Sequence, residues 1–148
     1  MAIDGPAAAG KGTIGLKLAK IFDFSYLDTG LLYRAVASKA LETGVFPEIV
    51  AQNLHEKDLL KSNLRDLNVA KEASIIAAVP EVRLALMDFQ KYFSEKTEGA
   101  VLDGRDIGTV GIHVGYTLSL LAPSLQVSIP HEHPHPEVLE RTRDRFLI

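Results

Sequence analysis

The chain has 148 residues, of which 47% are hydrophobic and 24% charged, with a formal net charge of -3 and no cysteine. This composition is that of a globular domain with a real core. It argues against general nucleic-acid binding, which needs a basic surface, and it excludes disulfides and thiolate metal sites. No signal peptide and no apolar run of about 18 residues is found. We therefore expect a soluble cytoplasmic monomer with neither a membrane nor a nucleic acid as partner.

The first part of the sequence predicts strands and helices in alternation. Strand, helix, strand and helix are expected in turn, at residues 1–4, 11–22, 25–28 and 29–43. Thr29 is the predicted N-cap of the second helix, and Gly44 is its natural end. This β-α-β-α order favours a parallel sheet with crossover helices.

The second part is more polar at first and then alternates again. Residues 56–64 (EKDLLKSNL) predict a short helix. Pro80 is expected to end one helix and begin the next, which carries an apolar stripe. Two helices, two strands and a final charged helix are expected in turn, at residues 68–78, 80–93, 100–104, 117–122 and 137–146.

The stretch AIDGPAAAGKGTIG (2–15) joins the first predicted strand to the first predicted helix through a glycine-rich turn. Gly5, Gly10 and Lys11 have the spacing of a phosphate-binding loop. The glycines let backbone N–H groups converge on phosphate oxygens, the helix N-terminus adds its positive dipole end, and the lysine adds a charge. The alternative is an ordinary glycine turn before an amphipathic helix, which the strand–loop–helix context disfavours.

The residues at the end of this loop narrow the class of phosphate-binding protein that the sequence predicts. In the common motif a hydroxyl follows the lysine and holds Mg²⁺, whereas here Gly12 intervenes and Thr13 is the nearest candidate. The GKGT ending resembles the nucleoside monophosphate kinases. The predicted ATP phosphate-binding residues are Gly5, Pro6, Ala7, Ala8, Ala9, Gly10, Lys11, Gly12 and Thr13.

Two further stretches place polar side chains at the ends of predicted strands. They are Asp28, Thr29, Tyr33 and Arg34 in YLDTGLLYRA (26–35), and Asp103, Arg105 and Asp106 in VLDGRDIGTV (101–110). Ligands bind at the carboxyl ends of parallel strands, and charges near a core need a partner or a role. From spacing alone, the arginines could equally be surface residues of helices, and Arg105 and Asp106 could form a local ion pair.

Together with ASIIAAVPEVRLAL (73–86), these stretches resemble the bacterial cytidylate kinase family, collinearly over roughly residues 1–110. The resemblance implies a P-loop NTPase-type three-layer α/β/α fold with a parallel sheet, which we expect to be incomplete at the C-terminus. One domain is expected over residues 1–148, with a core at 1–43 and 100–122, a monophosphate-binding helical insert at about 44–98, and a divergent tail at 123–148.

The resemblance also implies a reaction and a set of site residues. The reaction is phosphoryl transfer from ATP, with Mg²⁺, to CMP or dCMP. Lys11, Arg105 and Asp103 are the implied catalytic residues, and Asp103 is a further candidate for Mg²⁺ by analogy with the Walker-B aspartate. The implied CMP-binding residues are Thr29, Tyr33, Arg34, Arg83, Arg105 and Asp106.

Two of these residues have more specific implied roles. Arg83 would contact the acceptor phosphate, and Asp106 would accept a hydrogen bond from the cytosine amino group. Uracil offers a carbonyl oxygen at that position, so a carboxylate there disfavours it.

The sequence departs from the family after Val110. Residues 117–127 (TLSLLAPSLQV) resemble a family strand and the start of an arginine-rich helix, yet Ser128 and Pro130 stand where lid arginines are expected. One such arginine is worth about 10³–10⁵ in rate. Three interpretations stay open: a kinase, a nucleotide-binding remnant with weak or no turnover, and a poorly folding product. The histidines of HEHPHP (131–136) are interpreted as part of a polar tail.

Overall fold

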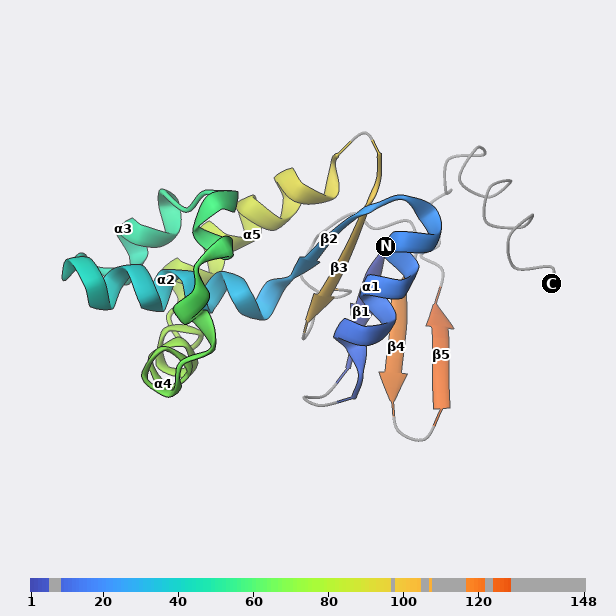
Figure 1. Cartoon of the computed structure of the whole chain (residues 1–148), viewed down its shortest axis with the longest axis horizontal. Coiled ribbons are helices and arrows are strands. Elements are labelled where there is room, and N and C mark those ends of the chain that lie inside the picture. The colour runs from blue at the N-terminus through green and yellow to red at the C-terminus, as the bar shows by residue number, and fades with distance from the viewer. Residues whose placement is uncertain (6–8, 97, 105–106, 108–116, 122–123, 129–148) are drawn as a thin grey trace.

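The computed structural model describes residues 1–5, 9–96, 98–104, 107, 117–121 and 124–128. Within this part of the chain, a mixed sheet has the strand order β2-β3-β1-β4-β5 (Figure 1). Its strands are β1 (Ala2–Asp4), β2 (Ser25–Asp28), β3 (Ala100–Gly104), β4 (Thr117–Leu121) and β5 (Ser124–Ser128). The first four run parallel, as predicted, because β1 pairs with both β3 and β4 and β2 pairs with β3.

The last strand corrects a prediction. Ser124–Ser128 forms β5, which pairs antiparallel with β4, whereas the resemblance implied the start of a helix there. Leu125 and Val127 alternate with polar neighbours, a period of two that is typical of a strand. The predicted helix at 137–146 lies outside the described residues.

Five α-helices accompany the sheet in the described part of the chain. They are α1 (Lys11–Phe22), α2 (Thr29–Thr43), α3 (Pro47–Gln52), α4 (Leu67–Ile76) and α5 (Pro80–Ser94). The helix expected at 56–64 is instead a pair of 3₁₀ turns, η1 (Glu56–Leu60) and η2 (Ser62–Arg65), and α3 was not predicted. We call α2–α5 with the two turns the helical lobe (Figure 1). No described helix is long and apolar enough to cross a membrane.

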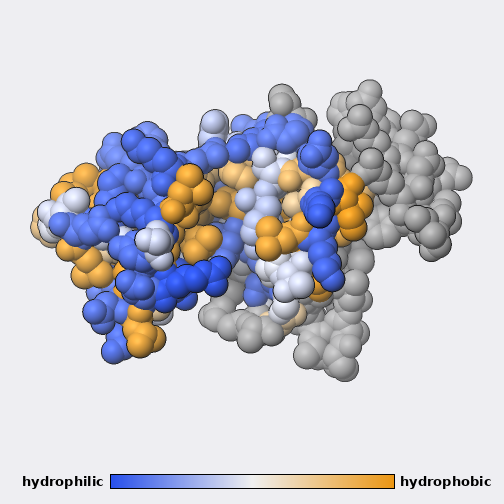
Figure 2. Space-filling model, in the orientation of Figure 1, coloured by the Kyte–Doolittle hydropathy of each residue, from blue (hydrophilic) through white to orange (hydrophobic). Residues whose placement is uncertain are grey.

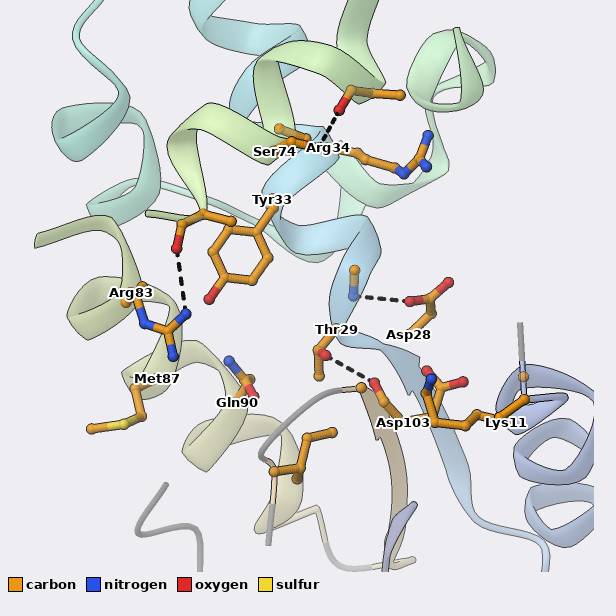
Figure 3. A pocket seen from close by; sticks show the side chains of 18 of the residues that line it. Lys11, Asp28, Thr29, Tyr33, Arg34, Ser74, Arg83, Met87, Gln90 and Asp103 are labelled. Carbon is orange, nitrogen blue, oxygen red and sulfur yellow. Dashed lines mark hydrogen bonds between the residues drawn. The ribbon is translucent and has the colours of Figure 1, made fainter. Parts of the chain in front are cut away.

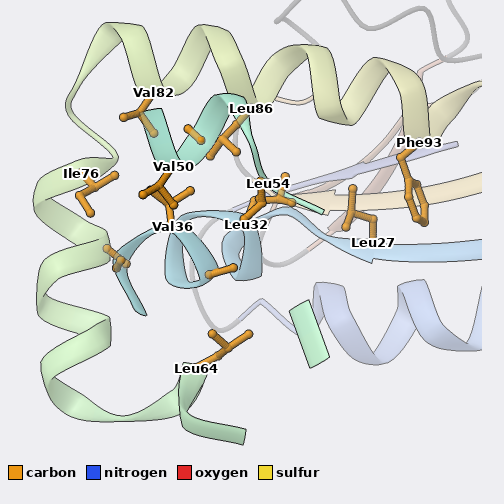
Figure 4. Packing of buried hydrophobic residues seen from close by; sticks show 14 of the residues in the cluster. Leu27, Leu32, Val36, Val50, Leu54, Leu64, Ile76, Val82, Leu86 and Phe93 are labelled. Carbon is orange, nitrogen blue, oxygen red and sulfur yellow. The ribbon is translucent and has the colours of Figure 1, made fainter. Parts of the chain in front are cut away.

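The strands bury opposite faces in two separate cores. Ile3 and Val101 pack toward α1 in one cluster. Leu27 and Leu102 belong to a larger cluster that continues into the helical lobe (Figure 4). Because successive strand residues point to opposite faces, this alternation puts α1 on one side of the sheet and the lobe on the other. The predicted three-layer α/β/α arrangement is confirmed.

The lobe is held together by the apolar stripe that the sequence predicts for α5. Val82 and Leu86 are fully buried, and they pack near Leu32 and Val36 of α2 (Figure 4). Each such side chain contributes about 1.5–3 kcal/mol of burial free energy. The opposite face of α5 does not take part in this core and is available to line a cleft.

The start of α2 differs from the prediction. Asp28, not Thr29, is the N-cap, since its Oδ1 accepts a hydrogen bond of 2.9 Å from the N–H of Gly30. The Thr29 hydroxyl donates instead to the carbonyl of Asp103, at 2.8 Å. Gly44 ends the helix with a φ of 69°, as predicted. The local cap and the tertiary contact thus use two adjacent residues and tie α2 to β3.

Candidate functional site

Three strand ends meet at one edge of the sheet. Asp28 at the end of β2 is in register with Asp103 of β3, and Asp4 of β1 is in register with Gly104. Such an edge is where open α/β sheets bind ligands. The structure therefore brings the predicted Asp103 beside the phosphate-loop strand, as expected from the alternation of elements.

The phosphate loop leads into a helix whose N-terminus is open. Gly10 is its N-cap, with a φ of 81°, and neither a side-chain cap nor an acidic residue occupies the first turn. The first N–H groups of a helix have no acceptor within the helix, which makes such an N-terminus a favourable place for an anion. Lys11 lies at this N-terminus, and its Nζ donates to the carbonyl of Gly5 at 2.9 Å, which folds the ammonium back over the loop. The predicted residues 6–8 lie outside the described part of the chain.

Asp103 is the buried titratable group of this edge. It is 5% exposed, and its Oδ1 has no hydrogen-bond partner among the described residues. Its pKa is raised to about 6, because burial and then the charge of the neighbouring Asp28 outweigh the opposing effects of the Tyr26 hydroxyl and Lys11. A buried oxygen without a partner is costly. It is therefore well suited to receive a ligand.

Tyr26 and two glycines of α1 form the wall behind Asp103. A Cβ added to Gly15 would lie 2.7 Å from the Tyr26 ring, so this residue must stay small. A Cβ at Gly12 would lie 3.4 Å from the Tyr26 hydroxyl and 3.6 Å from Asp103 Oδ2. The position that follows the lysine thus faces the carboxylate. Thr13 belongs to the same turn and lines the same cleft.

A cleft of about 1190 Å³ separates this edge from the helical lobe (Figure 3). Single-ligand pockets typically measure about 300–1,000 Å³, so the cleft has room for more than one ligand. Figure 2 shows hydrophilic residues over much of the lobe surface seen in that view. The predicted site residues that line the cleft are Ala9, Gly10, Lys11, Gly12, Thr13, Thr29, Tyr33, Arg34, Arg83 and Asp103.

The lobe wall of the cleft carries two anchored arginines. Arg34 donates to the carbonyl of Leu64 at 3.0 Å, and Arg83 donates to the carbonyl of Ala77 at 3.3 Å. A guanidinium has five N–H donors in a planar fork, so each retains donors for phosphate oxygens. Between them, Tyr33 is half-buried, and burial raises its pKa while the charge of Arg83 lowers it.

Two predicted CMP-binding residues are not among the residues that the structure describes, and two residues that were not predicted line the cleft. Arg105 and Asp106 lie outside the described residues, although the neighbouring Ile107 lines the cleft. Sequence reasoning missed Met87 and Gln90, which also line it (Figure 3). Both lie four and seven residues after Arg83, a spacing that places them on the same helical face, and this periodicity is the signal that could have identified them.

The residues present fit a Mg²⁺ ion. The described residues contain no group of three or more His, Asp or Glu side chains that would cage a metal. Mg²⁺ does not need one, because it binds through one or two carboxylates together with phosphates and water. The unpartnered Oδ1 of Asp103 supplies such a ligand beside the phosphate loop.

A strand followed by a glycine-rich segment and a helix N-terminus, at the edge of parallel strands, is the arrangement of P-loop-type α/β domains. The profile of the family described as cytidylate kinase matches residues 1–54 and 47–114. The chain belongs to the cytidylate kinase family.

Individual relatives agree with this assignment. The cytidylate kinase of Cereibacter sphaeroides is 56% identical over 110 residues, which cover 74% of this chain and 53% of the relative. That of Acidiphilium cryptum is 45% identical over 139 residues, covering 90% and 65%. That of Paramagnetospirillum magneticum is 50% identical over 119 residues, covering 74% and 56%. The chain therefore spans little more than half to under two thirds of the length of these relatives.

Proposed function

We propose that the chain binds ATP and CMP or dCMP in this cleft and transfers the γ-phosphoryl group, giving ADP and CDP or dCDP. The observation that carries the proposal is the pairing of two walls across one cleft. The phosphate loop with Lys11 forms one wall, and Arg34 and Arg83 of the helical lobe form the other. The names of the relatives, cytidylate kinases, support the choice of acceptor.

The sheet wall would hold the phosphoryl donor. Lys11, the N–H groups at the start of α1 and the loop backbone stabilise negative charge on the ATP phosphates. Asp103 and Thr13 would hold Mg²⁺, which, when bound, neutralises charge on the transferring group. Lys11 would exchange its hydrogen bond to the Gly5 carbonyl for one to a phosphate oxygen.

The lobe wall would hold the acceptor. Arg34 and Arg83, with the sequence-predicted Arg105, bind the acceptor nucleotide and place its phosphate in line with the donor. Thr29 and Tyr33 line the space between the arginines and the strand ends. No covalent enzyme intermediate is involved, because catalysis here consists of positioning and charge stabilisation.

A second candidate function is nucleotide binding with weak or no turnover. The observation that favours it is β5, because Ser124–Ser128 is a strand where the resemblance implied the arginine-rich helix. Without a transition-state arginine, phosphoryl transfer slows by about 10³–10⁵ while binding persists.

A coupled assay for ADP release tests the proposal, using ATP, Mg²⁺ and CMP, with UMP and AMP as alternative acceptors. We expect CMP-dependent turnover that falls at least about 100-fold in Lys11→Ala. Lys17→Ala, on the exposed face of the same helix, is the matched control and should keep the activity. Thermal stabilisation by ATP or CMP without turnover would favour the second candidate. Neither binding nor turnover by a folded chain would contradict both.

A further inference from the structure

Buried polar residues divide into two groups in this molecule. In the described part of the chain they are Thr29, Ser38, Asp58, Gln90 and Asp103. Ser38 and Asp58 are hydrogen-bonded within the helical lobe. The other three line the cleft, and of these only Gln90 has no role in the proposed reaction.

Gln90 lies at the floor of the cleft, on the face of α5 that carries Arg83 (Figure 3). Burial increases along this face, from the exposed Arg83 through the half-buried Met87 to Gln90, which is 9% exposed. A group that reaches Gln90 is therefore largely desolvated. Hydrogen bonds count most for specificity at such a point, because water cannot replace a missing partner.

The orientation of the Gln90 amide is set by its own helix. Its Nε2 donates to the carbonyl of Leu86 at 3.2 Å. A flip of the amide would bring its oxygen against that carbonyl, where no hydrogen can lie between the two acceptors. Within the described residues no group donates to Oε1. One hydrogen of Nε2 is thus committed to Leu86, which fixes the orientation of the amide and leaves Oε1 as an acceptor for an occupant of the cleft.

Thr29 has the same polarity on the facing side. Its hydroxyl hydrogen is committed to the Asp103 carbonyl, so its oxygen is left as an acceptor. An occupant that offers an N–H group satisfies these oxygens, whereas one that offers a carbonyl leaves them unpaired and brings acceptors together. The exocyclic amino group of cytosine has two N–H hydrogens, and uracil has a carbonyl oxygen in its place.

Resting on the proposed function, we propose that Gln90 is a specificity-determining residue of the acceptor site, whose Oε1 accepts a hydrogen bond from the 4-amino group of the cytosine base. The hydrogen bond to the Leu86 carbonyl thus holds the Gln90 amide in the orientation that favours cytosine over uracil.

The test measures binding of two nucleotides by calorimetry, CMP and the ribonucleoside monophosphate of pyrimidin-2-one, which lacks the amino group. The wild-type chain should bind CMP about tenfold more tightly than the analogue. Gln90→Met removes the acceptor at nearly equal length, and the preference for CMP over the analogue should fall at least about threefold. Gln52→Met, at an exposed position in α3, is the matched control and should keep the tenfold preference.

A second variant keeps the outcomes distinct, because Gln90→Leu also removes the acceptor and replaces Gln90→Met if that variant does not fold. A folded Gln90→Met or Gln90→Leu chain with the wild-type preference would overturn the proposal while leaving the proposed function intact. A wild-type chain that binds ATP but neither pyrimidine nucleotide would overturn the acceptor assignment and this proposal with it.

Discussion

Asp103 at the edge of the sheet and Asp58 in the helical lobe are almost equally buried, at 5% and 7% exposed, yet their pKa values move in opposite directions. Burial and the nearby Asp28 raise the pKa of Asp103 to about 6. Burial also acts to raise the pKa of Asp58, but the N–H of His55 and the ammonium of Lys39 outweigh it, and the pKa is lowered.

The difference lies in the partners and not in the depth. Asp58 accepts hydrogen bonds from His55 N–H at 3.0 Å and from Lys39 Nζ at 3.3 Å, whereas Asp103 has an oxygen without a partner among the described residues. The lobe carboxylate is therefore part of the scaffold. The strand-end carboxylate has an oxygen that can still accept a hydrogen bond or bind a cation, which is typical of functional sites.

The largest effect on this comparison is expected from Asp58→Ala. The substitution leaves the His55 N–H and a partly buried Lys39 without their acceptor, so the free energy of unfolding should fall by about 3 kcal/mol. Urea unfolding measures it. Asp88→Ala, at an exposed position in the middle of α5 in the same lobe, should change stability by less than about 0.5 kcal/mol. Equal effects of the two substitutions would contradict a structural role for Asp58.

A smaller effect is expected from the pH dependence of Asp103. Its pKa in the folded chain, about 6, lies above the ordinary 3.8, so the folded chain binds the proton more tightly than the unfolded chain. The stabilisation is complete below about pH 4 and is lost as the pH rises through 6. The difference in unfolding free energy between wild type and Asp103→Asn should therefore fall by about 2 kcal/mol from pH 4 to pH 7.

Urea unfolding at several pH values, without Mg²⁺ or nucleotide, gives this difference directly. Asp58 has the opposite sign, because its lowered pKa gives stability above about pH 4 that is lost only at lower pH. A wild-type-minus-Asp103→Asn difference that is flat or rises with pH would contradict a raised pKa of Asp103 in the folded chain.

The smallest effect is expected from substitutions of Asp28, whose charge contributes to the pKa of Asp103. Asp28 caps α2 and also contributes to the raised pKa of Asp103. Asp28→Asn keeps a capping side chain but removes the charge, whereas Asp28→Ala loses both and should cost about 1 kcal/mol more. Both variants should lower the pKa of the Asp103 carboxyl, measured by NMR titration. An unchanged pKa would assign the whole shift to burial.

Sequence patterns predicted the parts of this structure that depend on near neighbours. The bounds of α1 and β2 and the apolar face of α5 follow from local periodicity and from glycine and proline positions. The phosphate loop was predicted for the same reason, because its function depends on the spacing of Gly5, Gly10 and Lys11 in one segment. The family resemblance then identified Arg34 and Arg83, which the structure places on the cleft.

The predictions that failed depend on partners distant in the sequence. Asp28 and Thr29 are both good capping residues, so the local sequence does not decide between them. The Thr29 hydroxyl bonds instead to the carbonyl of Asp103, which is distant in the sequence, and Asp28 is left to cap α2. The strand β5 depends on pairing with β4, whereas the resemblance to the family implied the start of a helix in the same residues. Gln90 is a polar residue in an amphipathic helix, and its importance appears only once Leu86 and the cleft are located.

The proposed function requires that the strand edge and the helical lobe hold two nucleotides in one cleft. Calorimetry with adenosine and cytidine joined through five phosphates is a stringent test of this arrangement, because linking two ligands makes the second binding event intramolecular. We predict that this compound binds at least about 100-fold more tightly than ATP or CMP alone, and that Lys11→Ala and Arg83→Ala each remove the gain. Binding no tighter than that of ATP would show that the two walls do not form one site.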